Sequence, residues 1–289
     1  MIRAATRQLR QRLPAPAVRL ARRGLLGWGW LTADLRPSPE ILVVGAQRAG
    51  TTTLFRMLSE HPQLRRPTVD KGTGYFDDGH VRGARWYRAH FPLRLRRGST
   101  MAFECSGFYL FHPLAADRIA RELPGCRVVV MVRDPVERAY SAYRHELARG
   151  YENLTFADAL AAEGRRLAED GRSPRSAHRP ATFSERHHSY LRRGQYAEQI
   201  ARFVDVLGPE RVHVVDAGLF FDDPVESYVR LQRALGLAEH RPSDVGRWNE
   251  RPGPPLAGEL HRQLRAHYEE HDAALARLLG HPPSWREKP

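Results

Sequence analysis

Short apolar runs alternate along the chain with stretches in which apolar residues recur at helical spacing. Runs of four to six mostly apolar residues predict strands over 40–45, 101–104, 127–132 and 211–215. Helical spacing, bounded by proline or glycine, predicts helices over 51–60, 114–123, 135–149, 224–235 and 256–279. Apolar strands that alternate with helices are typical of a parallel sheet, so the pattern predicts an α/β fold with helices on both faces of the sheet.

The two ends of this pattern and its middle are less regular. Residues 1–38 form a basic arm, with eight arginines in the first 36 residues and no acid before Asp34. Its apolar part is interrupted by Gly27 and Gly29, which argues against a secretory signal. We expect the arm to pack on the domain or hang beside it, or alternatively residues 1–36 to contact an anionic membrane from the cytoplasmic side.

The rest of the chain, 39–289, is predicted to be a single domain. Within it, residues 150–190 form a polar insertion, for which the pattern predicts a helix over 156–168 and a loop over 169–181.

Composition excludes several classes of protein. Hydrophobic residues make up 42% of the 289 and charged residues 27%, which excludes disordered and fibrous chains. No apolar run approaches the roughly 18 residues of a membrane-spanning helix. Two cysteines cannot build a disulfide framework, so we expect a reducing, cytoplasmic setting.

Charge adds one informative residue. The net charge is +13, and 44 of the 46 cationic residues are arginine, leaving only Lys71 and Lys288. Such a surface attracts anions, and a nucleic-acid-binding protein is one possible explanation. That explanation leaves the motifs below unexplained, so no specific nucleic acid is expected as a partner. Lys71 stands out because a compact ammonium occurs where this chain otherwise uses arginine.

The turn after the first strand has the spacing of a phosphate-binding loop. Residues 45–53 read GAQRAGTTT, which matches G-x-x-x-x-G-K-[ST] except that threonine replaces lysine. Backbone N–H groups at the start of the following helix, together with threonine hydroxyls, bind phosphate well. The predicted phosphate-binding residues are Gln47, Arg48, Ala49, Gly50, Thr51, Thr52 and Thr53.

A second motif follows the strand at 127–132. Arg133 ends this strand, at the sheet edge where open α/β folds bind ligands. Ser141 lies two helical turns further on, so its hydroxyl can return to the same edge. A guanidinium binds two phosphate oxygens at once, and the pair therefore predicts a second phosphate site.

The two motifs, GAQRAGTTTL and VRDPVERAYSAY, resemble those of the sulfotransferases that use 3′-phosphoadenosine 5′-phosphosulfate (PAPS). Stretches over 71–79, 85–92, 103–113 and 192–200 are similar to the bacterial and heparan-sulfate branch, and the resemblance covers roughly residues 40–285. It implies a P-loop-like fold and transfer of sulfonate from PAPS to a hydroxyl of a glycan, glycolipid or similar acceptor. It also implies that the first loop holds the 5′-phosphosulfate, that Arg133 and Ser141 hold the 3′-phosphate, and that 3′-phosphoadenosine 5′-phosphate (PAP) is the product.

The chain departs from the family where the chemistry occurs. Arg48 replaces a lysine, and Lys71-Gly72-Thr73-Gly74-Tyr75-Phe76 stands where the glycan branch reads K-E-x-H-F-F. The resemblance implies that Lys71 reaches the transferring sulfonate, but both the acid and the histidine are glycine. Glu104 is the favoured replacement base because some relatives use a matching glutamate. His80 is the second candidate, and His112 is expected to be structural.

Two alternatives remain. Asp134 follows a strand and could mimic the magnesium-holding acid of a P-loop kinase or nucleotide hydrolase, or the chain binds PAP or PAPS without turnover. No His, Cys or Asp cluster has ligand spacing, so no metal is expected.

Overall fold

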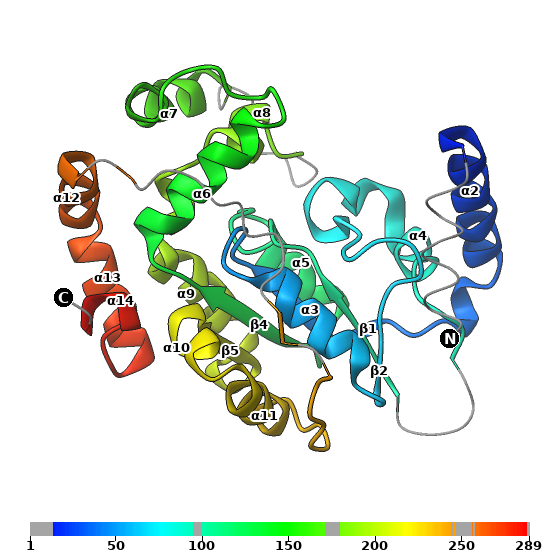
Figure 1. The fold of residues 1–289 in the computed structure, drawn as a ribbon. Coiled ribbons are helices and arrows are strands. Elements are labelled where there is room, and N and C mark those ends of the chain that lie inside the picture. Colours follow the sequence, from blue (N-terminus) through cyan, green and yellow to red (C-terminus); the bar gives the residue numbers. More distant parts are fainter. Residues whose placement is uncertain are drawn as a thin grey trace.

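Five parallel strands form the centre of the fold (Figure 1). The computed structural model describes residues 14–94, 100–170, 180–243, 245–246, 256 and 258–287. In sheet order the strands are β2 (Leu64–Arg65), β3 (Met101–Cys105), β1 (Pro39–Gly45), β4 (Arg127–Val132) and β5 (Val212–Asp216). The four predicted strands are confirmed to within a residue or two, and of the strands in the described residues only the two-residue β2 was not predicted.

The central strands are apolar because both of their faces are covered. Every residue of β1 from Ile41 to Gly45 is buried, as is every residue of β4 after Arg127. Val43 pairs with Val129 of β4 on one side and with Cys105 of β3 on the other. The carboxyl ends of β1, β3 and β4 therefore lie together at one edge of the sheet.

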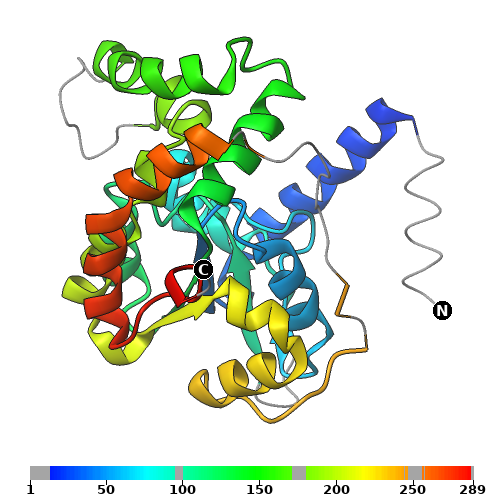
Figure 2. The ribbon, with the colours of Figure 1, turned by 60° about the vertical axis from the view of Figure 1, so that its left-hand side comes forward.

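Helices cover both faces, as predicted (Figures 1 and 2). On one face lie α3 (Thr51–Glu60) and α11 (Pro224–Ala234), joined by the Tyr228 hydroxyl, which donates to the Met57 carbonyl at 3.0 Å. On the other face α9 (Tyr196–Leu207) packs against α5 (Ala115–Glu122) and α13 (Glu269–Leu279). The other α-helices in the described part of the chain are α2 (Ala15–Leu31), α4 (Gly83–Arg88), α6 (Pro135–Leu147), α7 (Phe156–Asp170), α8 (Phe183–His187), α10 (Ala217–Asp222), α12 (Gly258–His267) and α14 (Ser284–Glu287).

The prediction of one helix over 256–279 is wrong. The chain forms two helices, α12 and α13, which meet at Tyr268. The Tyr268 side chain is fully buried, and its hydroxyl donates to the Leu191 carbonyl at 3.0 Å. The chain bends there because α12 packs on α6 whereas α13 packs on α9.

The insertion contributes helices beside α6. The helix predicted over 156–168 is confirmed as α7, which ends two residues later. Of the loop predicted over 169–181, residues 171–179 lie outside the described residues. A second apolar cluster joins α6 to α7 and includes Val136, Phe156 and Tyr190.

The described part of the N-terminal arm packs on the domain. Helix α2 contacts α4, and Gly29 approaches so closely that a Cβ there would lie 2.2 Å from the Ala89 carbonyl oxygen. Arg22 forms an ion pair with Asp70. Within the described ranges, no helix combines the length and hydropathy needed to cross a bilayer.

Candidate active site

The phosphate loop lies between β1 and α3. Gly50 is the N-cap of α3 and has a left-handed backbone, with φ of 92°. A Cβ at this position would lie 2.7 Å from the ring of Phe221, so glycine is required for both reasons. The first turn of α3 places its backbone N–H groups beside the hydroxyls of Thr51–Thr53, an arrangement suited to an anion. The Thr53 N–H donates to the Gly50 carbonyl at 3.0 Å.

Lys71 reaches this helix start from a different part of the chain. Its Nζ donates to the Thr51 hydroxyl at 3.0 Å and to the Thr52 hydroxyl at 3.2 Å. A hydrogen bond from the Cys105 N–H to the Lys71 carbonyl fixes the backbone against the end of β3. The ammonium thus adds a full positive charge to the partial charge of the helix N-terminus.

The two phosphate motifs meet at Arg48. Its Nε donates to the Ser141 hydroxyl of α6 at 3.1 Å, and its carbonyl accepts from the Arg133 guanidinium at 3.3 Å. Arg48 itself has a left-handed backbone, with φ of 73°, which is unfavourable for a residue with a side chain. The loop is held in this conformation by groups of the second motif, 85 and 93 residues away.

Asp134 has a structural role at the same edge. Its carboxylate accepts from the N–H groups of Val136 and Glu137, at 2.8 and 3.4 Å, and so caps α6. Arg133 also pairs with Glu137, at 3.3 Å. The carboxylate that a kinase-like reading would assign to magnesium is thus a helix cap.

Glu104 lies inside the protein at the end of β3 and is fully buried. It accepts hydrogen bonds from the hydroxyls of Thr73 and Ser106, both at 2.9 Å. Burial raises the pKa of this carboxyl, although its hydrogen bonds oppose that effect. Because Ser106 also accepts from the Gly74 N–H at 3.3 Å, Glu104 holds the 72–74 segment against the sheet.

The two glycines of this segment are not equivalent. A Cβ on Gly72 would lie 2.3 Å from the Ser106 Oγ and 2.4 Å from the Cys105 carbonyl oxygen, so no side chain fits. Gly74 has a φ of 66°, and a Cβ there would lie 3.0 Å from an oxygen of Asp77. The Asp77 carboxylate therefore occupies the space into which a side chain at position 74 would project.

Asp77 was not among the predicted site residues. Its side chain is 5% exposed and lies 3.8 Å from the Arg186 guanidinium. Burial raises its pKa to about 6, against the opposing effect of Arg186. The backbone at Asp77 leaves the helical region, with φ of −100° and ψ of −107°, and this kink turns the carboxylate inward. The only signal in the sequence was an acid that closely follows Lys71.

His80 and His112 form contacts elsewhere. The His80 ring pairs with Glu122 at 2.6 Å, beside the hydroxyl of Tyr75, which donates to the same carboxylate at 2.8 Å. His112 is buried, and its Nδ1 accepts from the Leu114 N–H at 3.3 Å, a local bond at the start of α5.

Arg193 is a second residue of the site that was not predicted from the sequence. It is buried, donates to the Gln47 side chain and to the Glu185 and Arg186 carbonyls, and stacks over Phe108 at 4.7 Å. Burial lowers its pKa to about 9. Gln47, predicted as a donor-site residue, is thereby fixed by a cation from the segment after α8.

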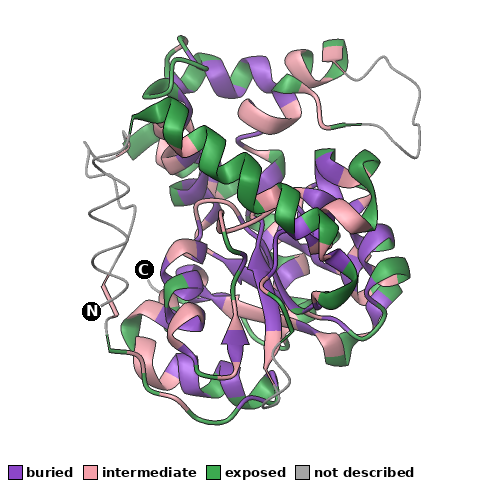
Figure 3. Ribbon diagram, turned by 90° about the vertical axis from the view of Figure 1, so that its right-hand side faces the viewer, coloured by how far each residue is buried: buried purple, intermediate pink, exposed green. Residues whose placement is uncertain are grey.

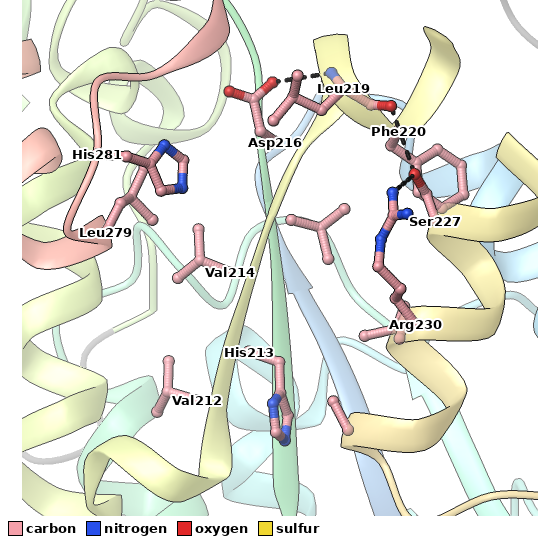
Figure 4. A pocket seen from close by; sticks show the side chains of 13 residues that line it. Val212, His213, Val214, Asp216, Leu219, Phe220, Ser227, Arg230, Leu279 and His281 are labelled. Atoms are coloured by element: carbon pink, nitrogen blue, oxygen red, sulfur yellow. Dashed lines mark hydrogen bonds between the residues drawn. The ribbon is translucent and has the colours of Figure 1, made fainter. Parts of the chain in front are cut away.

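A cavity of about 430 Å³ lies elsewhere, along the outer edge of β5 (Figure 4). Its polar side chains include Asp216, which caps α10, and Arg230, which donates to Ser227 at 2.7 Å. Its lining comes from β5, α10, α11 and the end of α13, not from the phosphate loop. We therefore place the candidate active site at the loop. The described residues hold no group of three or more potential metal ligands.

The comparisons with known proteins all point to one family. The profile of the sulfotransferase domain matches residues 38–247. The human bifunctional heparan sulfate N-deacetylase/N-sulfotransferase 3 is 25% identical over 284 residues, which cover 86% of this chain but 31% of that protein. The mouse heparan sulfate glucosamine 3-O-sulfotransferase 3B1 is 27% identical, covering 88% of this chain and 66% of that one. The solved sulfotransferase from Alicyclobacillus acidocaldarius is 28% identical with a TM-score of 0.71, covering 86% of this chain and 99% of its own.

Proposed function

Because the chain belongs to the sulfotransferase domain family, we propose that it transfers a sulfonate group from PAPS to a hydroxyl of a glycan, glycolipid or similar acceptor. The observation that carries this proposal is the contact between Arg48 and Ser141, since it joins the two phosphate motifs at one sheet edge. PAPS has anionic groups at its 5′ and 3′ positions, and this edge offers one cationic residue from each motif, Arg48 and Arg133. The heparan sulfate enzymes among the relatives support a carbohydrate-like acceptor.

The residues present suit the donor. Backbone N–H groups of 47–53 and the hydroxyls of Thr51–Thr53 would bind the 5′-phosphosulfate. Arg133 and Ser141 would bind the 3′-phosphate, for which the guanidinium supplies two donors. When bound, PAPS supplies an activated sulfonate whose leaving group is a phosphate oxygen of PAP. Neither role requires a metal.

The transfer exchanges one sulfur–oxygen bond for another. The acceptor oxygen forms a bond to sulfur while the bond from sulfur to the bridging oxygen of PAP breaks, and the electron pair stays on PAP. Lys71 and Arg48 would stabilise the negative charge that develops on the sulfonate and bridging oxygens. Arg48 acts through charge alone, because a guanidinium does not release its proton in this pH range.

The acceptor hydroxyl must also lose its proton, and we favour Asp77 over Glu104 as the base. Asp77 occupies the space next to Gly74, where the family's glycan branch has a histidine side chain. Glu104 has no exposed surface and is surrounded by donors, which suits a positioning residue better than a group that meets the acceptor. A base with a pKa near 6 is ionised at neutral pH and still accepts a proton readily.

Donor binding is tested by calorimetric titration with PAP beside ATP and magnesium. We expect tight binding of PAP and none of ATP with magnesium. Transfer is tested by incubating the enzyme with labelled PAPS and a panel of oligosaccharides and glycolipids, and measuring both labelled product and PAP. Binding of ATP with magnesium alone would favour the kinase alternative, and PAP binding with no product from any acceptor would favour a chain without turnover.

Replacing Arg133 by alanine gives a sharper test of the donor site. Hydrogen bonds to charged groups are worth about 1.5–3 kcal/mol, so affinity for PAP is expected to fall by about 10- to 150-fold. Adenosine 5′-phosphate lacks the 3′-phosphate, so its affinity should fall much less, and only through the lost bond from Arg133 to the Arg48 carbonyl. Arg277→Ala, at an exposed position of α13, is the matched control for lost charge. Equal losses for both nucleotides would refute the assignment to the 3′-phosphate.

A further inference from the structure

Helix α2 packs on the domain through one narrow face. Val18, Arg22, Leu26 and Gly29 follow one another at spacings of four, four and three residues and therefore lie on one side of the helix. Gly29 is buried against Ala89, Val18 and Leu26 are half-buried, and Arg22 pairs with Asp70. This inner face accounts for the attachment of α2 to the domain.

The opposite face of α2, here called the outer face, is apolar and uncovered. It consists of Leu20, Gly24, Gly27, Trp28 and Leu31, all exposed. The side chains of Leu20, Trp28 and Leu31 are 73%, 57% and 66% exposed. Viewed from the side on which α2 lies, the helix is coloured almost entirely as exposed (Figure 3). Three large apolar side chains gathered on one exposed face indicate a binding surface.

The charges beside the outer face are all positive. Arg19 and Arg23 are exposed along its flank, and the first 33 residues of the chain contain no acid. Asp34, which follows α2, pairs with Arg85 and Arg88, and Asp70 pairs with Arg22 on the inner face. A partner for this surface therefore has an apolar layer bordered by negative charge.

We propose that the outer face of α2 docks on an anionic lipid bilayer, with α2 lying in the plane of the interface. Leucine and tryptophan on one side and arginine along the flank are the composition of interfacial helices. Tryptophan favours the headgroup level, and arginine attracts anionic lipids. Charge complementarity thus favours a bilayer over a second copy of this chain, which carries a net charge of +13 itself.

The experiment is sedimentation of the full chain with vesicles of phosphatidylglycerol and phosphatidylcholine in equal parts, and with vesicles of phosphatidylcholine alone. We expect binding to the mixed vesicles, weakened by salt. Each arginine near such a surface is worth about fivefold in affinity, so Arg19→Ser with Arg23→Ser should weaken binding about 25-fold. Trp28→Ser with Leu31→Ser should weaken it at least about tenfold.

The matched control is Leu278→Ser, which removes a leucine that is 46% exposed on α13 and should leave binding unchanged. All substituted side chains are exposed, so the variants are expected to fold, and thermal melting checks this. The proposal is overturned if the wild type does not bind, or if the α2 variants bind as tightly as the control. It is also overturned if α2 instead mediates a dimer in solution. Light scattering would then give the mass of a dimer for the wild type and a lower mass for Trp28→Ser with Leu31→Ser.

Discussion

Replacing Asp77 by asparagine is expected to lower the turnover number by about 10²- to 10⁴-fold, the usual contribution of a general base. Asparagine keeps the shape of the side chain and the oxygen that accepts from the Asp78 N–H at 2.5 Å, but it accepts no proton. PAP affinity should stay within about twofold, since the donor-site residues are unchanged. In the wild type, turnover should rise with pH through about 6, where Asp77 ionises, and this rise should be absent from the residual activity of the variant.

Glu104→Gln separates the two carboxylates. A positioning role predicts a loss of activity with the pH-dependent limb retained, because Asp77 still ionises. The limb should move to lower pH, since the Glu104 charge helps raise the pKa of Asp77. If Asp77→Asn retains wild-type turnover while Glu104→Gln removes the pH-dependent limb, Glu104 is the base and our assignment is wrong.

Asp77→Asn should also raise the free energy of unfolding at neutral pH. The pKa of Asp77 is about 6 in the folded state against 3.8 for an ordinary aspartate. The folded state therefore binds more protons between these values, and the wild type loses stability as pH rises from about 4 to 6. The loss amounts to about 3 kcal/mol above pH 6 and is absent from Asp77→Asn. The groups facing Asp77 are Arg186, Asp78, Glu104, Arg118 and Tyr109. Urea unfolding of both proteins at pH 4 and pH 7 measures the difference.

Gly72→Ala is expected to destabilise the fold by about 1–3 kcal/mol and to lower activity at least about 100-fold. The new methyl group would lie 2.4 Å from a backbone oxygen at the end of β3, which cannot move without disturbing the sheet. Any shift of the backbone at position 72 also displaces the neighbouring Lys71. It displaces Ser106 too, whose hydroxyl donates to Glu104. Gly72→Glu, which restores the acid of the family's glycan branch, should be at least as damaging and should not supply a base.

The control for this prediction is Gly164→Ala in α7. A Cβ at Gly164 meets nothing within 4 Å, so alanine should be neutral or slightly stabilising there. Higher activity in Gly72→Glu than in the wild type would show that the segment adapts to an acid, against the tight fit described above.

The sheet and most of its helices could be predicted because their signals are local. Strands covered on both faces must be apolar, and β4, which reads RVVVMV, is almost uniformly so. The turn at 45–53 could be predicted because glycine spacing follows backbone conformation, and Gly50 is left-handed as expected for such a loop. Its binding of phosphate stays a prediction. Its contact with Ser141 agrees with the expectation that the two motifs share one sheet edge.

The features that were missed depend on contacts between distant segments. The position of Asp77 results from a backbone kink, and two adjacent acids in FDDG give no sign of which one turns inward. Gly29 was interpreted as an interruption of an apolar run, whereas it is the position where α2 touches the Ala89 carbonyl. One helix was predicted where α12 and α13 meet at Tyr268, because the helical spacing of apolar residues continues through that position. The spacing does not show that each half packs on a different helix.

The position of Arg193 in the sequence determines when the site can form during synthesis of the chain. Its side chain joins Gln47 of the phosphate loop, which lies 146 residues earlier in the sequence, to the Glu185 carbonyl. A nascent chain that ends before Arg193 already contains both phosphate motifs, yet it lacks the cation that fixes Gln47. Contacts of such long sequence separation form late, since the intervening chain must first be ordered. The proposed donor site is therefore completed only after about two-thirds of the chain has left the ribosome, so we expect a fragment that contains the two motifs alone to lack a working donor site.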